Sequence, residues 1–230
     1  MQSHSRFPSQ LDIAAVFCLA VLPDLLQSMF VVTGVVRASG YTFAYMHNSL
    51  IVRSLQASVP IILIMHLRNV RWSDHGFTRC HVRDVAVALG LVVISYGAYA
   101  VVYNILVQFG CDHNAGTEVI SEMLHFMSPT AAVAIPVIFV SSAANGFAEE
   151  LALRSYLIPR IVEVSGSRVA AVLVTSVLVA THHLYQGPLG AAAAFSTGIV
   201  FGAYFVEKRR FWPVAIAHAL MDVVPQLIQR

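Results

Sequence analysis

The stretch Ala148-Glu149-Glu150-Leu151-Ala152-Leu153-Arg154 places three charged side chains near the end of an apolar run from Ala131 to Leu157. Each charge costs about 2.5–3.5 kcal/mol at the centre of a membrane helix by insertion scales, so a helix that only spans a membrane would not carry them. Successive residues of an α-helix lie about 100° apart, so Glu150 and Arg154 share a face while Glu149 points elsewhere. We therefore expect Glu150 and Arg154 to neutralise each other and Glu149 to remain partly unpaired.

An unpaired carboxylate in a desolvated place is suited to act as a general base. Glu149 is therefore a candidate catalytic base, with Glu150 and Arg154 as its support. The three charges could instead serve only to join this helix to its neighbours, and this stretch alone leaves both interpretations open.

The composition predicts an all-α polytopic membrane protein. The 230 residues are 57% hydrophobic and 11% charged, with a mean hydropathy of +0.72, whereas a typical soluble domain is about 25% charged. Spans of about 20 apolar residues are predicted at seven places: 11–36, 43–67, 84–109, 131–158, 168–186, 189–206 and 211–228. We expect one integral membrane domain over residues 1–230, with N-terminal helices at about 11–109 and a motif-bearing core at about 131–228. The three cysteines are too scattered for a disulfide framework, and no removable signal peptide is predicted.

The basic residues predict how the chain is oriented. Ten of the 14 lysines and arginines fall on one side of the seven spans: Arg6, Arg68, Arg71, Arg79, Arg83, Arg160, Arg168, Lys208, Arg209 and Arg210. Arg37 and Arg230 fall on the other side. The positive-inside rule then predicts a cytoplasmic N-terminus and an external C-terminus.

Two further features of the helices concern packing and pairing. Asp24 and Arg53 lie in the first and second predicted spans, where they could pair near mid-membrane; alternatively, Arg53 lies nearer the helix end and extends to the interface. The sixth span has small residues at every fourth position (Gly190, Ala194, Gly198 and Gly202), a stripe that predicts close approach of a neighbouring helix.

Polar side chains on two other spans lie at depths similar to that of Glu149. The fifth span ends in His182 and His183, and the seventh carries His218 and Asp222, which share a face at i and i+4. A lone histidine in an apolar helix is usually a satisfied core residue. Carboxylates and histidines on three helices at similar depth are better explained by a common site.

These motifs resemble those of the CPBP family, which contains the CAAX prenyl endopeptidases and bacteriocin-processing or immunity proteins. The resemblance rests on Glu149-Glu150-x-x-x-Arg154, on His183-Leu184-Tyr185-Gln186-Gly187 and on His218-x-x-x-Asp222, and it covers about residues 139–226. It implies an intramembrane endopeptidase of the glutamate type in a prokaryotic plasma membrane. The partners it implies are the lipid bilayer and a peptide or protein substrate at the membrane, with no nucleic acid; the oligomeric state stays open.

By this resemblance, Glu149 and His183 activate water, His218 and Asp222 stabilise the oxyanion, and Glu150 and Arg154 support the site. The sequence departs from the family in two ways. The aromatic residue expected four positions before the second-motif histidine is Val179, or Leu178 if His182 is the match. The third motif often ends in Asn, and an ionised Asp222 cannot donate a hydrogen bond, so it must be protonated or serve only to orient His218.

Alternatives remain for the cofactor and for the function. No cofactor is expected, although Glu149, His183 and His218 could form a two-histidine, one-carboxylate zinc site. Instead of an enzyme, the protein could be a non-enzymatic membrane immunity or scaffold protein that binds a peptide or a partner enzyme. Buried Glu, His and Asp also occur in transporters and proton relays. The sequence, however, contains neither the repeated halves nor the paired broken helices that are typical of transporters.

Overall fold

The computed structural model describes residues 9–34, 42–112, 121, 125 and 134–228, and this part of the chain contains helices and no strand. The all-α prediction is therefore confirmed. The helices are α1 (Ser9–Val16), α2 (Leu22–Val32), α3 (Phe43–Leu67), α4 (Val82–Gln108), α6 (Ile135–Glu150), α7 (Ile158–Ser165), α8 (Arg168–His182), α9 (Gly187–Lys208) and α10 (Phe211–Ile228). Two π-helical segments, Phe17–Val21 and Leu151–Leu157, and two 3-10 turns, Trp72–His75 and Leu184–Gln186, connect them.

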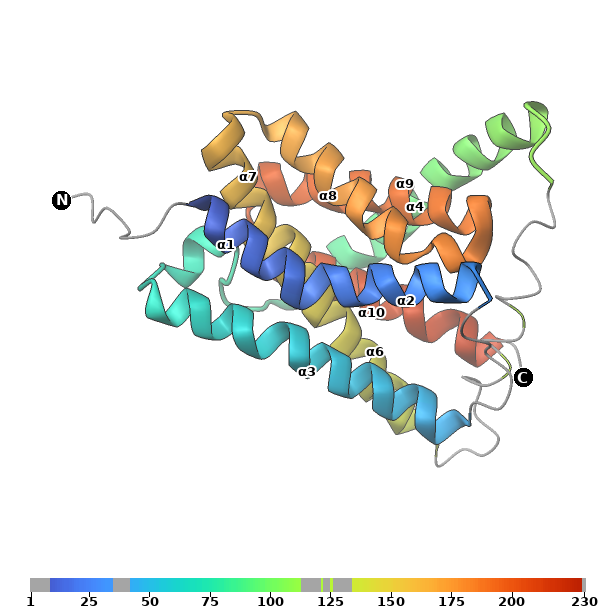
Figure 1. The fold of residues 1–230 in the computed structure, drawn as a ribbon, viewed down its shortest axis with the longest axis horizontal. Helices are drawn as coiled ribbons and strands as arrows, with labels where there is room; N and C mark the ends of the chain where they lie inside the picture. Colours follow the sequence, from blue (N-terminus) through green and yellow to red (C-terminus); the bar gives the residue numbers. More distant parts are fainter. Residues whose placement is uncertain (1–8, 35–41, 113–120, 122–124, 126–133, 229–230) are drawn as a thin grey trace.

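Helix α6 lies at the centre of the bundle. It packs against α3 on one side and α10 on the other, while α9 packs against α8 and α4, and α4 also contacts α10. Figure 1 shows α1 and α2 end to end as one long helix, and α3 running beside it and diverging from it toward the right of the view. The polar residues of α6 and α10 therefore face each other inside the bundle.

Five helical stretches in the described part of the chain are long and apolar enough to cross a membrane: Gln10–Val32, Phe43–Leu67, Val82–Gln108, Leu184–Lys208 and Phe211–Ile228. These correspond to five of the seven predicted spans. The predicted span 168–186 is the shorter helix α8 followed by a 3-10 turn, because the helix ends at His182. The stretch that carries Glu149, Glu150 and Arg154 is not among the five.

The helix predicted over 131–158 continues further than expected. From Ile135 it runs without a break through the π-helical segment Leu151–Leu157 and α7 to Ser165, and it ends at Gly166, whose φ is +68°. Pro159 lies in this continuous helix, directly after the π-helical segment. The predicted end at 158 was therefore wrong.

The connection between α3 and α4 folds back onto the bundle. The ring of Phe77 stacks on Phe211 with centroids 4.4 Å apart, and Trp212 donates from Nε1 to the carbonyl oxygen of Thr78 at 2.7 Å. His75 is buried and donates from Nδ1 to the carbonyl oxygen of Ser155 at 2.7 Å, while the Ser155 hydroxyl donates to the carbonyl oxygen of His75. Burial lowers the pKa of His75, so its imidazole is neutral. The neutral side chain makes the contact with Ser155 of the π-helical segment.

Charged residues predicted on one side of the membrane lie together at one end of the bundle. Asp12, which is buried, pairs with Arg68 and lies 4.0 Å from Arg160. Arg210 forms hydrogen bonds to both carboxylate oxygens of Asp84 at 2.7 Å. The first set of contacts brings the ends of α1, α3 and α7 together, and the second joins the start of α4 to the start of α10.

The close approach of a neighbouring helix that the small-residue stripe of α9 predicted occurs against α8, at Gly198 and Gly202. A Cβ added to Gly198 would lie 2.8 Å from the Cα of Ser176, and one added to Gly202 would lie 3.0 Å from Val172. The two backbones therefore approach too closely for larger side chains.

The basic residues predict which side each terminus occupies. We expect a reporter that is active only outside the cytoplasm to be active when fused after Arg230, because the charge asymmetry places that end outside. A reporter that is active only in the cytoplasm, fused at the same position, is the control, and its activity would contradict the predicted orientation.

Candidate active site

A cavity of about 560 Å³ lies between the N-terminal helices and the motif-bearing helices. Helices α2 and α3 form one wall, and α6, the end of α8 and α10 form the other. The titratable residues of the lining are Asp24, Tyr45, Arg53, Glu149, His182, His183, Tyr185, His218 and Asp222. All four residues predicted to be catalytic line this one cavity, which the sequence could not establish.

Gly146 allows α6 and α10 to approach closely beside this cavity. A Cβ at this position would lie 2.9 Å from the backbone nitrogen of Ala219 and 3.2 Å from the Cβ of His218. Any side chain here would push the two helices apart. The glycine thus brings His218 next to the two glutamates one turn further along α6.

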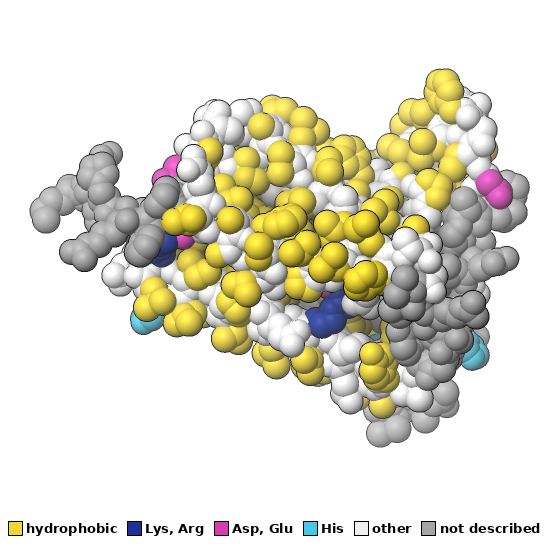
Figure 2. All heavy atoms as spheres, in the orientation of Figure 1, with side chains coloured by type: hydrophobic (Ala, Val, Ile, Leu, Met, Phe, Trp, Pro, Cys, Tyr) yellow, Lys and Arg dark blue, Asp and Glu magenta, His cyan; other side chains and the backbone are white. Residues whose placement is uncertain are grey.

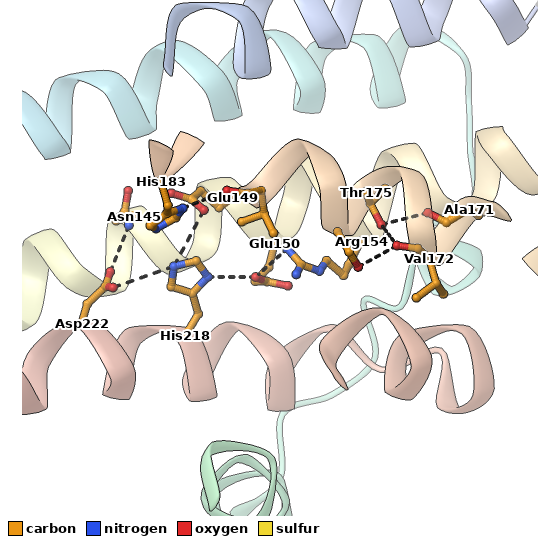
Figure 3. Close-up of polar contacts among 12 residues, drawn as sticks. Asn145, Glu149, Glu150, Arg154, Ala171, Val172, Thr175, His183, His218 and Asp222 are labelled. Carbon is orange, nitrogen blue, oxygen red and sulfur yellow. Dashed lines mark hydrogen bonds and ion pairs between the residues drawn. The ribbon is translucent and has the colours of Figure 1, made fainter. Parts of the chain in front are cut away.

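Glu150 is fully buried and has two partners. Its Oε1 lies 3.1 Å from Arg154 Nη1 and accepts a hydrogen bond from His218 Nδ1 at 2.8 Å. The pairing of Glu150 with Arg154 that helical spacing predicted is therefore present. Figure 3 shows the three side chains in a row along the interface of α6 and α10. The contact with Glu150 also orients the imidazole, so that Nε2 faces the cavity.

Glu149 differs from its neighbour, as predicted. Its Oε2 is buried but has no hydrogen-bond partner in the described part of the chain. The nearest charged or titratable partner is His218 Nε2, at 3.9 Å. A gap of this size is longer than a direct hydrogen bond, so the carboxylate is available to a water or substrate atom in the cavity.

Asp222 and Asn145 form a pair that motif analysis missed. Asn145 Nδ2 donates to Asp222 Oδ2 at 2.9 Å, whereas Asp222 Oδ1 remains 3.9 Å from His218 Nε2. Asn145 lies on α6 four residues before Glu149, so the two share a face and both line the cavity. That spacing of an amide side chain in an apolar helix is the sequence signal that could have identified Asn145.

The adjacent histidines both line the cavity but have different surroundings. His183 donates from Nδ1 to the carbonyl oxygen of Val179 at 2.8 Å and stacks on Tyr185, with centroids 6.2 Å apart. Its Nε2 is thus left as an acceptor, and Figure 3 shows its ring beside Glu149 and Asn145. His182 is 6% exposed, and neither of its ring nitrogens has a hydrogen-bond partner among the described residues.

The arrangement does not fit the alternative zinc site. Within the described ranges, no three His, Cys, Asp or Glu side chains are grouped so that they could hold a metal ion. Glu149, His183 and His218 line the same cavity, but they do not form such a group. We therefore derive no chemistry through a metal.

The ion pair considered for Asp24 and Arg53 is present, on the cavity wall formed by α2 and α3. Arg53 Nη2 of α3 contacts Asp24 Oδ1 of α2. The alternative, in which Arg53 extends alone to the interface, does not occur.

Together, the helical bundle and this cavity define an integral membrane protein with an internal polar site. Residues 131–224 match the model of the Rce1-like family, the type II CAAX prenyl endopeptidases. This part of the chain is therefore similar to a family of membrane proteases, in agreement with the resemblance seen in the motifs. No curated protein and no solved structure matches the chain.

We predict that Glu150 and Arg154 are needed for folding. Glu150→Gln or Arg154→Gln should lower the free energy of unfolding by about 3–5 kcal/mol, because each leaves a buried charge unpaired. The double variant should recover part of that loss. The melting temperature of the detergent-solubilised protein measures the effect.

Glu163→Gln is the matched control, because Glu163 is 53% exposed in its pair with Arg160 and such surface pairs contribute little. Glu149→Gln should also leave the melting temperature nearly unchanged. Equal melting temperatures for Glu150→Gln and Glu163→Gln would contradict the structural role of the buried pair.

Proposed function

We propose that the protein is an intramembrane endopeptidase of the glutamate type. Its substrate is a membrane-associated or C-terminally processed protein. The observation that carries this proposal is the difference between the two adjacent glutamates. Glu150 is neutralised by buried partners, whereas Glu149 presents an unpaired carboxylate to a cavity that also contains imidazoles.

In the proposed reaction, Glu149 takes a proton from a water held between its carboxylate and Nε2 of His183. The water oxygen attacks the carbonyl carbon of the scissile peptide bond and forms a tetrahedral oxyanion. When the carbon–nitrogen bond breaks, the proton on Glu149 passes to the departing amine. Base catalysis by a positioned side chain typically contributes about 10²–10⁴-fold.

The oxyanion needs hydrogen-bond donors, and the cavity offers two. Glu150 holds His218 by its Nδ1, so Nε2–H of the protonated imidazole points between Glu149 and Asp222. The second donor is the amide of Asn145, which has one N–H on Asp222 and another free for substrate. In this proposal an ionised Asp222 orients Asn145 instead of donating itself, which accounts for the departure from the family's third motif.

We propose that this reaction needs no metal, because the His, Cys, Asp and Glu side chains of the described residues are not grouped as metal ligands. Activity should then persist in protein shown to be metal-free after chelation. Loss of activity on chelation and its return with zinc would instead support the metal alternative.

Processing should depend on the Glu149 carboxylate. In cells that express Glu149→Gln at the wild-type level, we expect uncleaved precursor proteins to accumulate, because the amide cannot accept the proton from water. Comparative proteomics of the two membrane fractions measures this, with Glu163→Gln as a control that should process normally.

Normal processing by a well-expressed Glu149→Gln protein would contradict the peptidase and favour a non-enzymatic protein that binds a peptide or partner enzyme. His183→Ala and His182→Ala, compared in the same assay, identify which histidine serves the water. We expect the greater loss from His183→Ala, because its bond to Val179 orients the ring.

Asn145→Ala should lower kcat by about 10²–10³-fold with little change in KM, as expected for loss of one oxyanion donor. Asp222→Asn should keep substantial activity, because its side-chain carbonyl can still accept from Asn145. Cleavage rates of an accumulated precursor by the purified variants measure both effects. Asn104→Ala is the control, since Asn104 donates to its own helix at the carbonyl oxygen of Ala100 and is not part of the cavity lining. An active Asn145→Ala together with an inactive, folded Asp222→Asn would assign the role to Asp222 instead.

A further inference from the structure

Arg53 is placed unusually for a residue of a membrane-spanning helix. It lies in the middle of α3, and its side chain is 34% exposed, while that of its partner Asp24 is 24% exposed. Figure 2 shows a small group of basic side-chain atoms within an otherwise mostly hydrophobic face, over the region where Figure 1 draws α2 and α3 diverging. Charges inside a membrane face the bundle interior or a polar cavity and mark functional sites. Both residues line the cavity that contains Glu149.

The guanidinium of Arg53 has donors to spare. Among the described residues, Asp24 is the side chain that forms an ion pair with it, through Nη2. A guanidinium carries five N–H donors and binds carboxylates through two parallel hydrogen bonds. The remaining donors can therefore take a second carboxylate while Asp24 holds the side chain in place.

The charges of the cavity lining favour a substrate carboxylate at Arg53. The lining contains three carboxylates (Asp24, Glu149 and Asp222), and Arg53 is its only lysine or arginine. The charge of Arg53 also interacts with that of Glu149 across the cavity. His218 on the opposite wall already has Glu149, Glu150 and Asp222 around it. A carboxylate that enters is therefore attracted to Arg53 on the α3 wall.

We propose that Arg53, held by Asp24, forms a subsite that binds the C-terminal carboxylate of the peptide. This inference rests on the proposed peptidase function and adds the group by which the substrate is oriented. With its anionic end at Arg53, a peptide lies across the cavity, and a bond upstream of that end faces Glu149. The subsite selects substrates cut close to their free C-terminus.

The subsite belongs to a part of the chain that the family match does not include. Asp24 and Arg53 lie on α2 and α3, whereas the match covers residues 131–224. In this proposal, the wall that holds Glu149 contains the catalytic residues, and the opposite wall binds the C-terminal carboxylate of the substrate.

Binding to the Glu149→Gln protein tests the subsite without cleavage. The probe is a fluorescent peptide that ends in a farnesylated CAAX sequence, made as the free acid, as the C-terminal amide, and as the amide with an acidic last side chain. Anisotropy in nanodiscs gives each Kd. With Arg53 present, the free acid should bind about tenfold or more tightly than the plain amide, as expected for a charge-assisted pair.

Asp24→Asn/Arg53→Gln, added to Glu149→Gln, removes both charges and so avoids an unpaired one. It should bind the acid and the amide within about twofold of each other. The matched control, Asp12→Asn/Arg68→Gln, neutralises another ion pair between the N-terminal helices and α3, but away from the cavity lining, and should keep the preference for the acid.

Equal binding of acid and amide, or a preference that survives Asp24→Asn/Arg53→Gln, would overturn the proposal. Tighter binding of the amide with an acidic side chain than of the free acid would move the recognised carboxylate to a side chain and overturn the C-terminal assignment. Wild-type protein that binds the acid through Arg53 but cleaves no peptide would retain the subsite while rejecting the peptidase.

Discussion

The buried carboxylate of Glu150 is the contact on which the rest of the site depends. It joins Arg154 of the π-helical segment to His218 of α10, and so connects two helices through one group. Without it, the guanidinium would be an unpaired charge in an apolar interior, and the imidazole would lose the bond that aims Nε2 at the cavity. The cost of burying charge here is offset only because three groups share it.

Backbone geometry makes this contact possible. Gly146 lets α10 approach α6 to a distance that no side chain would allow, and the π-helical turn from Leu151 keeps the helix continuous past the charged residues. The loop between α3 and α4 then braces the π-helical segment through His75 and Ser155. The local departures from regular α-helix and the close helix pair thus occur next to the proposed catalytic residues.

The cavity divides its roles between two parts of the chain. The Rce1-like part contributes Glu149, the histidines, Asn145 and Asp222 from α6, α8 and α10. The N-terminal helices contribute the Asp24–Arg53 pair and much of the apolar wall.

The sequence by itself determined the all-α membrane fold, the pairing of Glu150 with Arg154 and the packing stripe of α9, because each follows from composition or from the period of one helix. Only the tertiary structure decided that Asn145 contacts Asp222 and that Glu150, more closely than Asp222, holds His218. It also showed that Arg53 lies across the cavity from Glu149 and that the helix containing Glu149 continues to Ser165. These features depend on how far apart and at what rotation separate helices pack, and no periodicity within one helix encodes that.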